Sequence, residues 1–158
     1  MSQSTEQELL SGLALTSFRL NGQFLALAEE MARPVGLTAA WWQVLGAVLN
    51  DPLPVAGIAR EMGMARQSVQ RIADLLVDRG LAEYRPNPAH RRAKLVAPTA
   101  QGRSAVHAID PAHAEVAARL SSAMGQQEMA SALAAMRRVG EVLDQLEVGA
   151  TTSAAQAG

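Results

Sequence analysis

The stretch from residue 55 to residue 97 decides the fold, and it reads VAGIAREMGMARQSVQRIADLLVDRGLAEYRPNPAHRRAKLVA. Its first part carries apolar residues at helical spacing and predicts two helices, 55–62 and 66–79, with a glycine at the turn between them. Its second part changes to an extended pattern and predicts two short strands, 81–85 and 93–97. The polar, proline-rich loop between these strands predicts a hairpin, which completes the order helix, tight turn, helix, hairpin.

The second helix of this stretch has one apolar and one polar face. Val69, Ile72 and Leu76 recur at helical spacing and form the face that should turn inward. A helix-turn-helix inserts its second helix into the major groove of DNA, where Arg pairs with guanine edges, Gln with adenine edges and Ser with phosphates. The outward side chains predicted to do this are Arg66, Gln67, Ser68, Gln70 and Arg71.

The hairpin that follows is basic. Between Arg85 and Arg103 there are five cationic residues and no acidic one. We expect Arg91, Arg92 and Lys94 to lie against the phosphates that flank the major groove, or in a minor groove. The alternative is a solvated cationic surface without a partner, and the helix-turn-helix beside the hairpin favours nucleic acid instead.

The 158-residue chain has a formal net charge of −1, which hides an uneven distribution. Residues 1–59 sum to −3, residues 60–103 to +5 and residues 104–158 to −3. A basic block within an acidic chain is typical of a nucleic-acid-binding module. The partner expected for this block is double-stranded DNA.

Helical patterns extend the chain on both sides of the block. On the N-terminal side they predict a long helix over 6–32 and a second helix over 39–50, capped by a threonine. After the hairpin a helix that Thr99 can cap begins at residue 100, is interrupted near Pro111 and resumes to Met124. Gly125 separates it from a last helix over 127–146. The small, polar stretch 149–158 is expected to be disordered.

Composition excludes several classes of function. Hydrophobic residues make up 49% and charged residues 18%, which suits a folded domain with a sizeable core. The chain has no cysteine, no hydrolase motif and no phosphate-binding glycine loop, so we expect neither an enzyme nor a cofactor. No signal peptide or membrane-spanning run is evident, so a cytoplasmic protein is expected.

Two histidines and an aspartate near residue 110 raise the question of a metal site. His107, Asp110 and His113 are each three residues apart, and Pro111 lies among them. This spacing places the two imidazoles on different sides of a regular helix rather than together. We therefore predict no metal site and assign these side chains to a polar surface or the edge of a pocket.

The central motifs recur, in the same order, in one known family. They are Gly36-Leu37-Thr38, Trp42, Leu45, Ile58-Ala59, Met62-Gly63, Ser68-Val69-Gln70-Arg71, Leu75 to Leu81, Arg85 to Leu95, and Thr99-Ala100-Gln101-Gly102. Through these residues the segment from Gly36 to Gly102 resembles the MarR family of winged helix-turn-helix regulators, named for multiple antibiotic resistance. The hairpin followed by Thr-x-x-Gly is the most discriminating part of the resemblance.

The resemblance implies a mainly α fold with a small β-hairpin, in which dimerisation helices flank a winged helix-turn-helix. The implied domains are an N-terminal dimerisation helix (1–36), the DNA-binding domain (37–102), C-terminal dimerisation helices (103–148) and the tail (149–158). The implied function is a homodimeric repressor of a palindromic operator, since two recognition helices about 34 Å apart read two half-sites. The alternatives are a monomeric helical core and a winged-helix module that binds protein rather than DNA.

Family members commonly bind small aromatic effectors between their dimerisation and DNA-binding parts, and the resemblance implies release from DNA by such a ligand. The candidate pocket residues are Ser17, Asn21, Trp41, Trp42 and His107. Adjacent helical residues point about 100° apart, so we expect Trp42 in the core and Trp41 at the pocket or the dimer surface. The alternative is that both indoles simply pack within the protein.

The chain departs from the family pattern in the wing, at Pro98, where the family often has leucine, and before the recognition helix. Asn87 and His90 stand where the family usually has aspartates, the second of which typically pairs with an arginine to hold the wing. Their replacement puts the rigidity of the wing in question and makes the wing more cationic. Met64 and Ala65 lack the usual Ser or Asp cap, so the recognition helix is predicted to begin without a side-chain cap.

Overall fold

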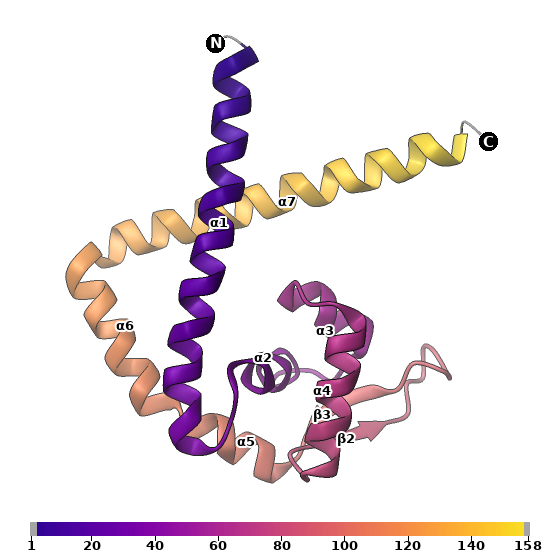
Figure 1. Cartoon of the computed structure of the whole chain (residues 1–158). Coiled ribbons are helices and arrows are strands. Elements are labelled where there is room, and N and C mark those ends of the chain that lie inside the picture. Colours follow the sequence, from indigo (N-terminus) through magenta and orange to yellow (C-terminus); the bar gives the residue numbers. More distant parts are fainter. Residues whose placement is uncertain (1–2, 157–158) are drawn as a thin grey trace. The chain divides into compact units, whose positions relative to one another are not determined.

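The computed structural model describes residues 3–156, with side chains for residues 4–147 (Figure 1). Its elements in chain order are α1 (Gln3–Ala32), the 3-10 turn η1 (Arg33–Val35), α2 (Ala39–Ala47), β1 (Leu53–Pro54), α3 (Val55–Met62), α4 (Arg66–Asp78), β2 (Ala82–Arg85), β3 (Leu95–Pro98), α5 (Ala100–His107), α6 (Asp110–Met124) and α7 (Gln126–Gln156). They form two compact units, of which the first ends at His113 and the second begins at Ala114. The mainly α fold with a small antiparallel sheet confirms the predicted fold class.

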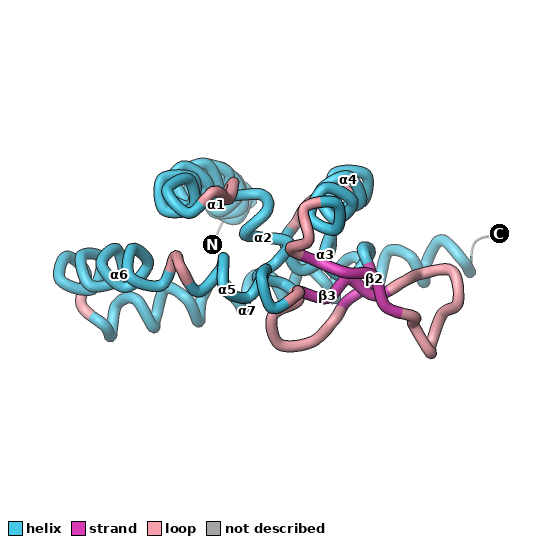
Figure 2. Tube along the Cα trace, turned by 90° about the horizontal axis from the view of Figure 1, so that it is seen from below, coloured by secondary structure: helices cyan, strands magenta, loops and turns pink. Residues whose placement is uncertain are grey.

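The sheet has three strands where the sequence predicts two. β3 lies in the middle and pairs antiparallel with β1 and with β2, with Pro54 opposite Leu95 and Tyr84 opposite Val96. β1 is two residues long and ends on a proline, which is typical of an edge strand. So short a strand has no sequence pattern from which it could be predicted. The loop that joins β2 to β3, residues 86–94, is the wing, and it reaches outward beyond the sheet (Figure 2).

The core of the first unit lies mainly within residues 37–109, which we call the winged segment, and Ala32 of α1 is buried against it. Helix α2 packs against α3, α4 and α5, and α4 packs against α3 and β2. The largest side chains that are fully buried there are Val44, Leu45, Val48, Ile58, Val69, Leu76, Val96 and Ile109. The inward face predicted for α4 is confirmed, because Val69, Ile72 and Leu76 are all buried.

Thr99 and Gly102 fix the start of α5 against the beginning of the hairpin. Thr99 Oγ1 accepts a hydrogen bond from the Gly102 amide at 3.0 Å and donates one to the Gly80 carbonyl oxygen at 2.6 Å. A Cβ on Gly102 would lie 1.9 Å from the Leu81 carbonyl oxygen, so only glycine permits this approach. The Thr-x-x-Gly motif thus ties α5 to the residues that lead into β2.

The start of α2 ties α1 to the winged segment. Glu29 of α1 accepts a hydrogen bond from the Ala39 amide at 2.7 Å, and Thr38 Oγ1 accepts one from the Trp41 amide at 3.1 Å. Both contacts satisfy amide groups that have no partner within the helix, and a carboxylate is favoured at that end. Thr38 is therefore the N-cap that the sequence predicts.

The last helix is longer than predicted. We expected it to end at Leu146 and the stretch 149–158 to be disordered, whereas α7 continues to Gln156. The positions after Gln156 lie outside the described residues. Residues 150–156 contain alanines and no proline, so the single Gly149 is not sufficient to stop the helix.

Candidate nucleic-acid interface

Helix α4 presents its predicted polar face to solvent. Arg66, Gln67, Gln70 and Arg71 are exposed, and Ser68 is half-buried. The helix begins without a side-chain cap, as predicted, and its first turn holds no acidic residue. This end of the helix is therefore electropositive and favours an anion such as a phosphate.

One groove joins α4 to the wing. It has a volume of about 600 Å³ and is lined by Pro54, Val55, Ala56, Arg66, Gln67, Gln70, Asp74, Tyr84, Arg92, Ala93 and Lys94. Three of the predicted base-reading residues and two of the predicted wing cations thus meet on one surface. Arg71 lines a neighbouring groove on α4 together with Leu75 and Asp78.

Two residues of this groove, Asp74 and Tyr84, are absent from the predicted site. Gln70 Nε2 donates to Asp74 Oδ1 at 3.1 Å and to the Tyr84 hydroxyl at 3.0 Å, and the Tyr84 hydroxyl donates to Asp74 Oδ1. Burial, followed by the hydrogen bond and the negative charge of Asp74, raises the pKa of Tyr84 to about 12. The spacing of Gln70 and Asp74, one helical turn apart, is a sequence signal for their pairing, whereas Tyr84 comes from another element.

Asn87 holds the wing from within. Its Nδ2 donates to the Ala93 carbonyl oxygen at 2.8 Å, and its Oδ1 accepts from the Ala89 amide at 3.1 Å. An amide can donate and accept at once, whereas a carboxylate only accepts. The Asn87 side chain therefore helps to close the loop, together with the backbone hydrogen bonds from the His90 amide to the Asn87 carbonyl oxygen and from the Ala93 amide to the His90 carbonyl oxygen.

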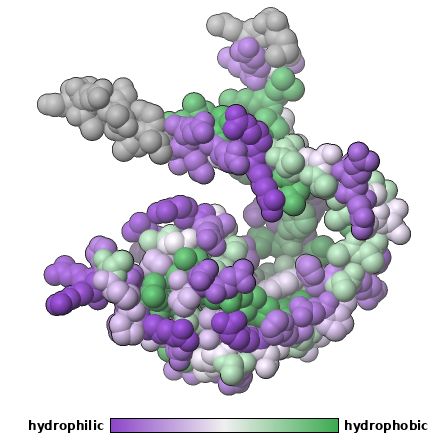
Figure 3. Space-filling model, turned by 180° about the vertical axis from the view of Figure 1, so that it is seen from behind, coloured by the Kyte–Doolittle hydropathy of each residue, from purple (hydrophilic) through white to green (hydrophobic). Residues whose placement is uncertain are grey.

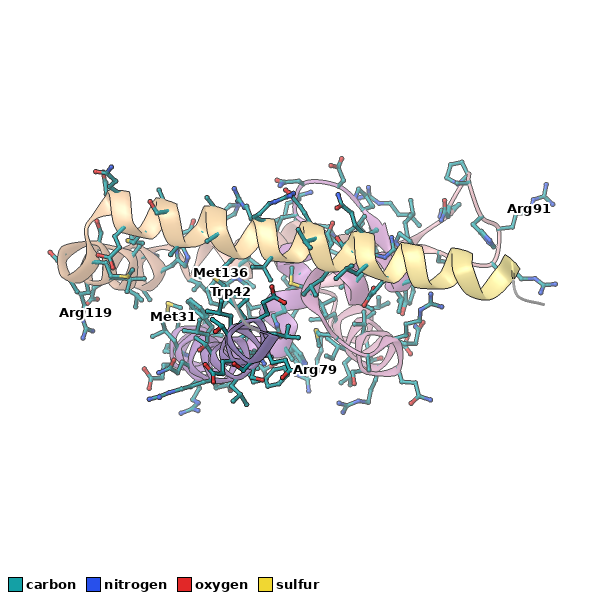
Figure 4. The ribbon with its side chains drawn as sticks, turned by 90° about the horizontal axis from the view of Figure 1, so that it is seen from above. Met31, Trp42, Arg79, Arg91, Arg119 and Met136 are labelled. Atoms are coloured by element: carbon teal, nitrogen blue, oxygen red, sulfur yellow. The ribbon has the colours of Figure 1, made fainter. Side chains whose placement is uncertain are left out.

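The wing cations extend into solvent. Arg91 stands at the outer end of the wing and points away from the rest of the winged segment (Figure 4). Arg92 and Lys94 are exposed, and Lys94 Nζ lies 5.8 Å from the centre of the Tyr84 ring. Among the described residues, the ion pair next to the wing joins Arg85 and Glu83, whose nitrogen and oxygen lie 2.7 Å apart. The three predicted wing cations are thus left for another partner.

The five candidate pocket residues have separate contacts. Ser17 donates to the Leu13 carbonyl oxygen within α1, and His107 Nδ1 lies 3.2 Å from Asp110 Oδ2. Asn21 is exposed on α1. These contacts do not join the residues into one cleft, and the pocket stays a prediction.

Of the two tryptophans, Trp42 differs from expectation, because it was expected in the core and is not fully buried. Both are half-buried and pack against the core of the winged segment. The Arg79 guanidinium lies 5.4 Å from the centre of the Trp41 ring, and the His113 ring meets Trp42 edge-on at 6.0 Å. The expected core position of Trp42 is therefore wrong in part, since this edge of the indole is covered by a polar ring at the surface.

Two negative findings concern the described residues alone. Within the part of the chain that the structure describes, no three side chains of His, Asp or Glu gather closely enough to hold a metal ion. No helix among those residues is long and apolar enough to cross a bilayer.

Comparison with known proteins places the chain in a family. Residues 35–93 match the model of the MarR family. An uncharacterized protein of Mycobacterium tuberculosis is 36% identical over 130 residues, which cover 82% of this chain and 91% of that protein.

Solved structures have the same fold. Bordetella bronchiseptica BpsR, whose DNA binding is regulated by 6-hydroxynicotinic acid, aligns with a TM-score of 0.69 and 20% identity over 82% of this chain and 98% of its own. A mutant MarR from E. coli complexed with operator DNA aligns with a TM-score of 0.66 and 21% identity over 88% of this chain and 99% of its own. The winged helix-turn-helix, the match over residues 35–93 and these neighbours lead to one conclusion: the chain belongs to the MarR family of transcription regulators.

Proposed function

We propose that this chain is a sequence-specific DNA-binding regulator that reads its operator with α4 and contacts the flanking phosphates with the wing. The observation that carries the proposal is the groove in which Arg66, Gln67 and Gln70 lie beside Arg92 and Lys94. Side chains that pair with base edges and cations that bind phosphates are the two kinds of contact that a DNA reader needs. The E. coli MarR mutant bound to operator DNA supports the proposal, because it shares this fold.

The remaining predicted residues take roles that follow from their positions. Arg71 is exposed on α4 and is proposed to contact a base edge. Ser68, near the start of α4, is proposed to hold a phosphate, as is Arg91 at the end of the wing. A regulator of chromosomal DNA acts in the cytoplasm, which is the location proposed here.

The dimer proposed for this regulator rests on an apolar surface of α1. The large hydrophobic side chains exposed there are Leu9, Leu10, Leu13, Leu15, Phe18 and Phe24. The N-terminal part of α1 shows accordingly as hydrophobic surface, whereas the wing tip is hydrophilic (Figure 3). Exposed apolar side chains of this size and number are typical of an association surface.

A second copy of the chain is the proposed occupant of that surface. Helix α7 exposes Leu133, Met136, Leu143 and Leu146 in the same way. We assign residues 1–36 and 103–148 to dimerisation and residues 37–102 to DNA binding. A two-fold dimer presents two copies of α4 to a palindromic operator.

Repression released by a small aromatic ligand is the regulatory part of the proposal. BpsR supports it, since its DNA binding is regulated by 6-hydroxynicotinic acid. The half-buried indoles of Trp41 and Trp42 offer aromatic surface at α2, close to both α1 and α4 in the packing. Quenching of their fluorescence by hydroxylated aromatic acids, together with loss of DNA binding at the same concentrations, is the expected result.

Fluorescence anisotropy with DNA fragments from upstream of the chain's own gene tests the proposal. We expect one fragment to bind far more tightly than scrambled DNA, with affinity that falls as salt rises, because phosphate contacts release counterions. A chain that binds no fragment at low ionic strength would instead be a winged-helix module for protein contacts. That result contradicts the proposed function.

A further inference from the structure

Three side chains form a cluster at the centre of the proposed DNA-reading surface. Gln70 is proposed to read a base, whereas Asp74 is an acid on a surface that faces a polyanion. A carboxylate on this surface repels phosphates, which is unfavourable for DNA binding. Its position beside Gln70 therefore suggests a structural function that compensates for the repulsion. Tyr84 reaches the same cluster from β2 and contacts both residues of α4.

The hydrogen bonds of the cluster fix the Gln70 amide in one orientation. Tyr84 has one hydroxyl hydrogen, which it donates to Asp74, so its oxygen accepts from Gln70 Nε2. If the Gln70 amide turned over, its Oε1 would face a carboxylate and a hydroxyl with no hydrogen left to donate. Nε2 therefore stays on the side of the cluster, and Oε1 occupies the other end of the amide.

We propose that Asp74 and Tyr84 are positioning residues that hold Gln70 Oε1 outward as a hydrogen-bond acceptor, so that Gln70 selects an adenine or a cytosine at one operator position. In the major groove the exocyclic amino groups of adenine and cytosine are donors, whereas guanine and thymine present carbonyl oxygens. An outward acceptor therefore pairs with the first two bases and leaves an unpaired polar contact with the others. The inference rests on the proposed function, because it needs DNA in the groove.

The Tyr84 hydroxyl keeps its hydrogen at physiological pH and well above it. Burial and the neighbouring Asp74 raise the pKa of Tyr84 to about 12, so the hydroxyl keeps the hydrogen that it donates. The phenol is half-buried, and Lys94 Nζ stands 5.8 Å from its ring centre. Because the folded pKa is raised above the ordinary value of 10, the arrangement is present below pH 10 and is lost as the pH rises towards 12.

Binding to a tight upstream fragment and to its single base-pair substitutions tests the inference. The wild-type chain should prefer adenine or cytosine about tenfold at one position of each half-site, and Gln70→Ala should abolish that preference. Asp74→Ala should reduce it to about twofold at the same position, because the Tyr84 hydroxyl can then donate its hydrogen to Gln70 Oε1 and the amide is free to turn. Tyr84→Phe should reduce it less, since Asp74 still accepts from Gln70 Nε2. Preference at the other positions should persist in both variants.

Glu83→Ala is the matched control. Like Asp74→Ala it removes one exposed carboxylate, but Glu83 pairs with Arg85, does not line the groove and lies outside the cluster. Both variants should bind all sequences more tightly, and only Asp74→Ala should lose the base preference. Asp74 is exposed, so this variant carries the test if Tyr84→Phe lowers the melting temperature.

The cluster is also observable without DNA. Tyr84 is the single tyrosine of the chain, so absorbance at 295 nm reports its ionisation alone. The midpoint should lie near pH 12 in the wild-type chain and move towards 10 in Asp74→Ala, since the carboxylate and its hydrogen bond are lost. An unchanged midpoint shows that the contact does not exist in solution and overturns the inference.

The outcomes separate the two proposals. Full base preference in Tyr84→Phe and Asp74→Ala overturns the positioning role and leaves the DNA-binding function intact, as does a preference for guanine or thymine at the Gln70 position. A wild-type chain that shows no salt-dependent DNA binding overturns both.

Discussion

The winged segment and the N-terminal part of α1 use their apolar residues in opposite ways. In the winged segment Leu45, Ile58 and Leu76 are fully buried, whereas in α1 Leu10 is 62% exposed and Phe18 71%. Both stretches carry apolar residues at helical spacing, so the pattern alone does not distinguish them. A single chain therefore buries the large apolar residues of the winged segment. Those of α1 stay exposed, and the second copy would cover them in the proposed dimer.

The largest effect on stability is expected for a fully buried side chain in the core of the winged segment. Leu76→Ala should lower the free energy of unfolding by about 3 kcal/mol, because the side chain is fully buried and leaves a cavity. Leu75→Ala is the control. The Leu75 side chain is 37% exposed, so its loss should lower the free energy of unfolding by less than about 1 kcal/mol. Urea denaturation measures both, and equal losses would contradict the burial difference between the two leucines.

The second effect concerns α1 and should leave the fold intact. Phe18→Glu should weaken self-association about 100-fold, since a buried phenylalanine contributes roughly 3 kcal/mol and each 1.4 kcal/mol is tenfold. Gln23→Glu is the control, because it adds the same charge to the side of α1 that carries Glu8 and Arg19. It should leave association unchanged. Sedimentation velocity over a concentration series measures both variants, and a Phe18→Glu chain that remains dimeric would refute α1 as the interface.

A third test compares the two pairs of adjacent arginines in the chain. Replacing Arg91 and Arg92 with alanine should weaken binding to every DNA sequence and flatten the slope of log K against log salt by about 1.8, because two phosphate contacts are lost. Arg137 and Arg138 of α7 lie outside the basic block, and their replacement should leave the slope unchanged. Anisotropy titrations at several salt concentrations measure the slopes, and equal slopes would show that the wing does not contact phosphates.

The smallest effect is expected within the wing. Asn87→Ala removes the two side-chain hydrogen bonds within the loop and leaves its backbone hydrogen bonds, so the half-buried site should lose about 1 kcal/mol of local stability. Amide hydrogen exchange at Ala89 should become roughly fivefold faster, while His90→Ala, an exposed wing residue, should leave it unchanged. Unaltered exchange in Asn87→Ala would mean that the backbone holds the wing without the side chain.

Short-range patterns predicted most of the winged segment. The observed bounds of α3, Val55–Met62, are those expected from the sequence, and α4 differs by one residue at its end. Thr38 and Thr99 cap the helices that they were predicted to cap. These features depend on residues three or four positions apart, which the chain order already places together.

The helix-turn-helix, the basic wing and the outward face of α4 could therefore be predicted from the order of residues alone. Tertiary structure decided the rest, because the partners are distant along the chain. β1 exists only through its pairing with β3, and Tyr84 joins Gln70 across fourteen positions. The exposure of the α1 side chains also depends on tertiary structure. Helical spacing shows which residues share a face, but not whether another surface covers that face.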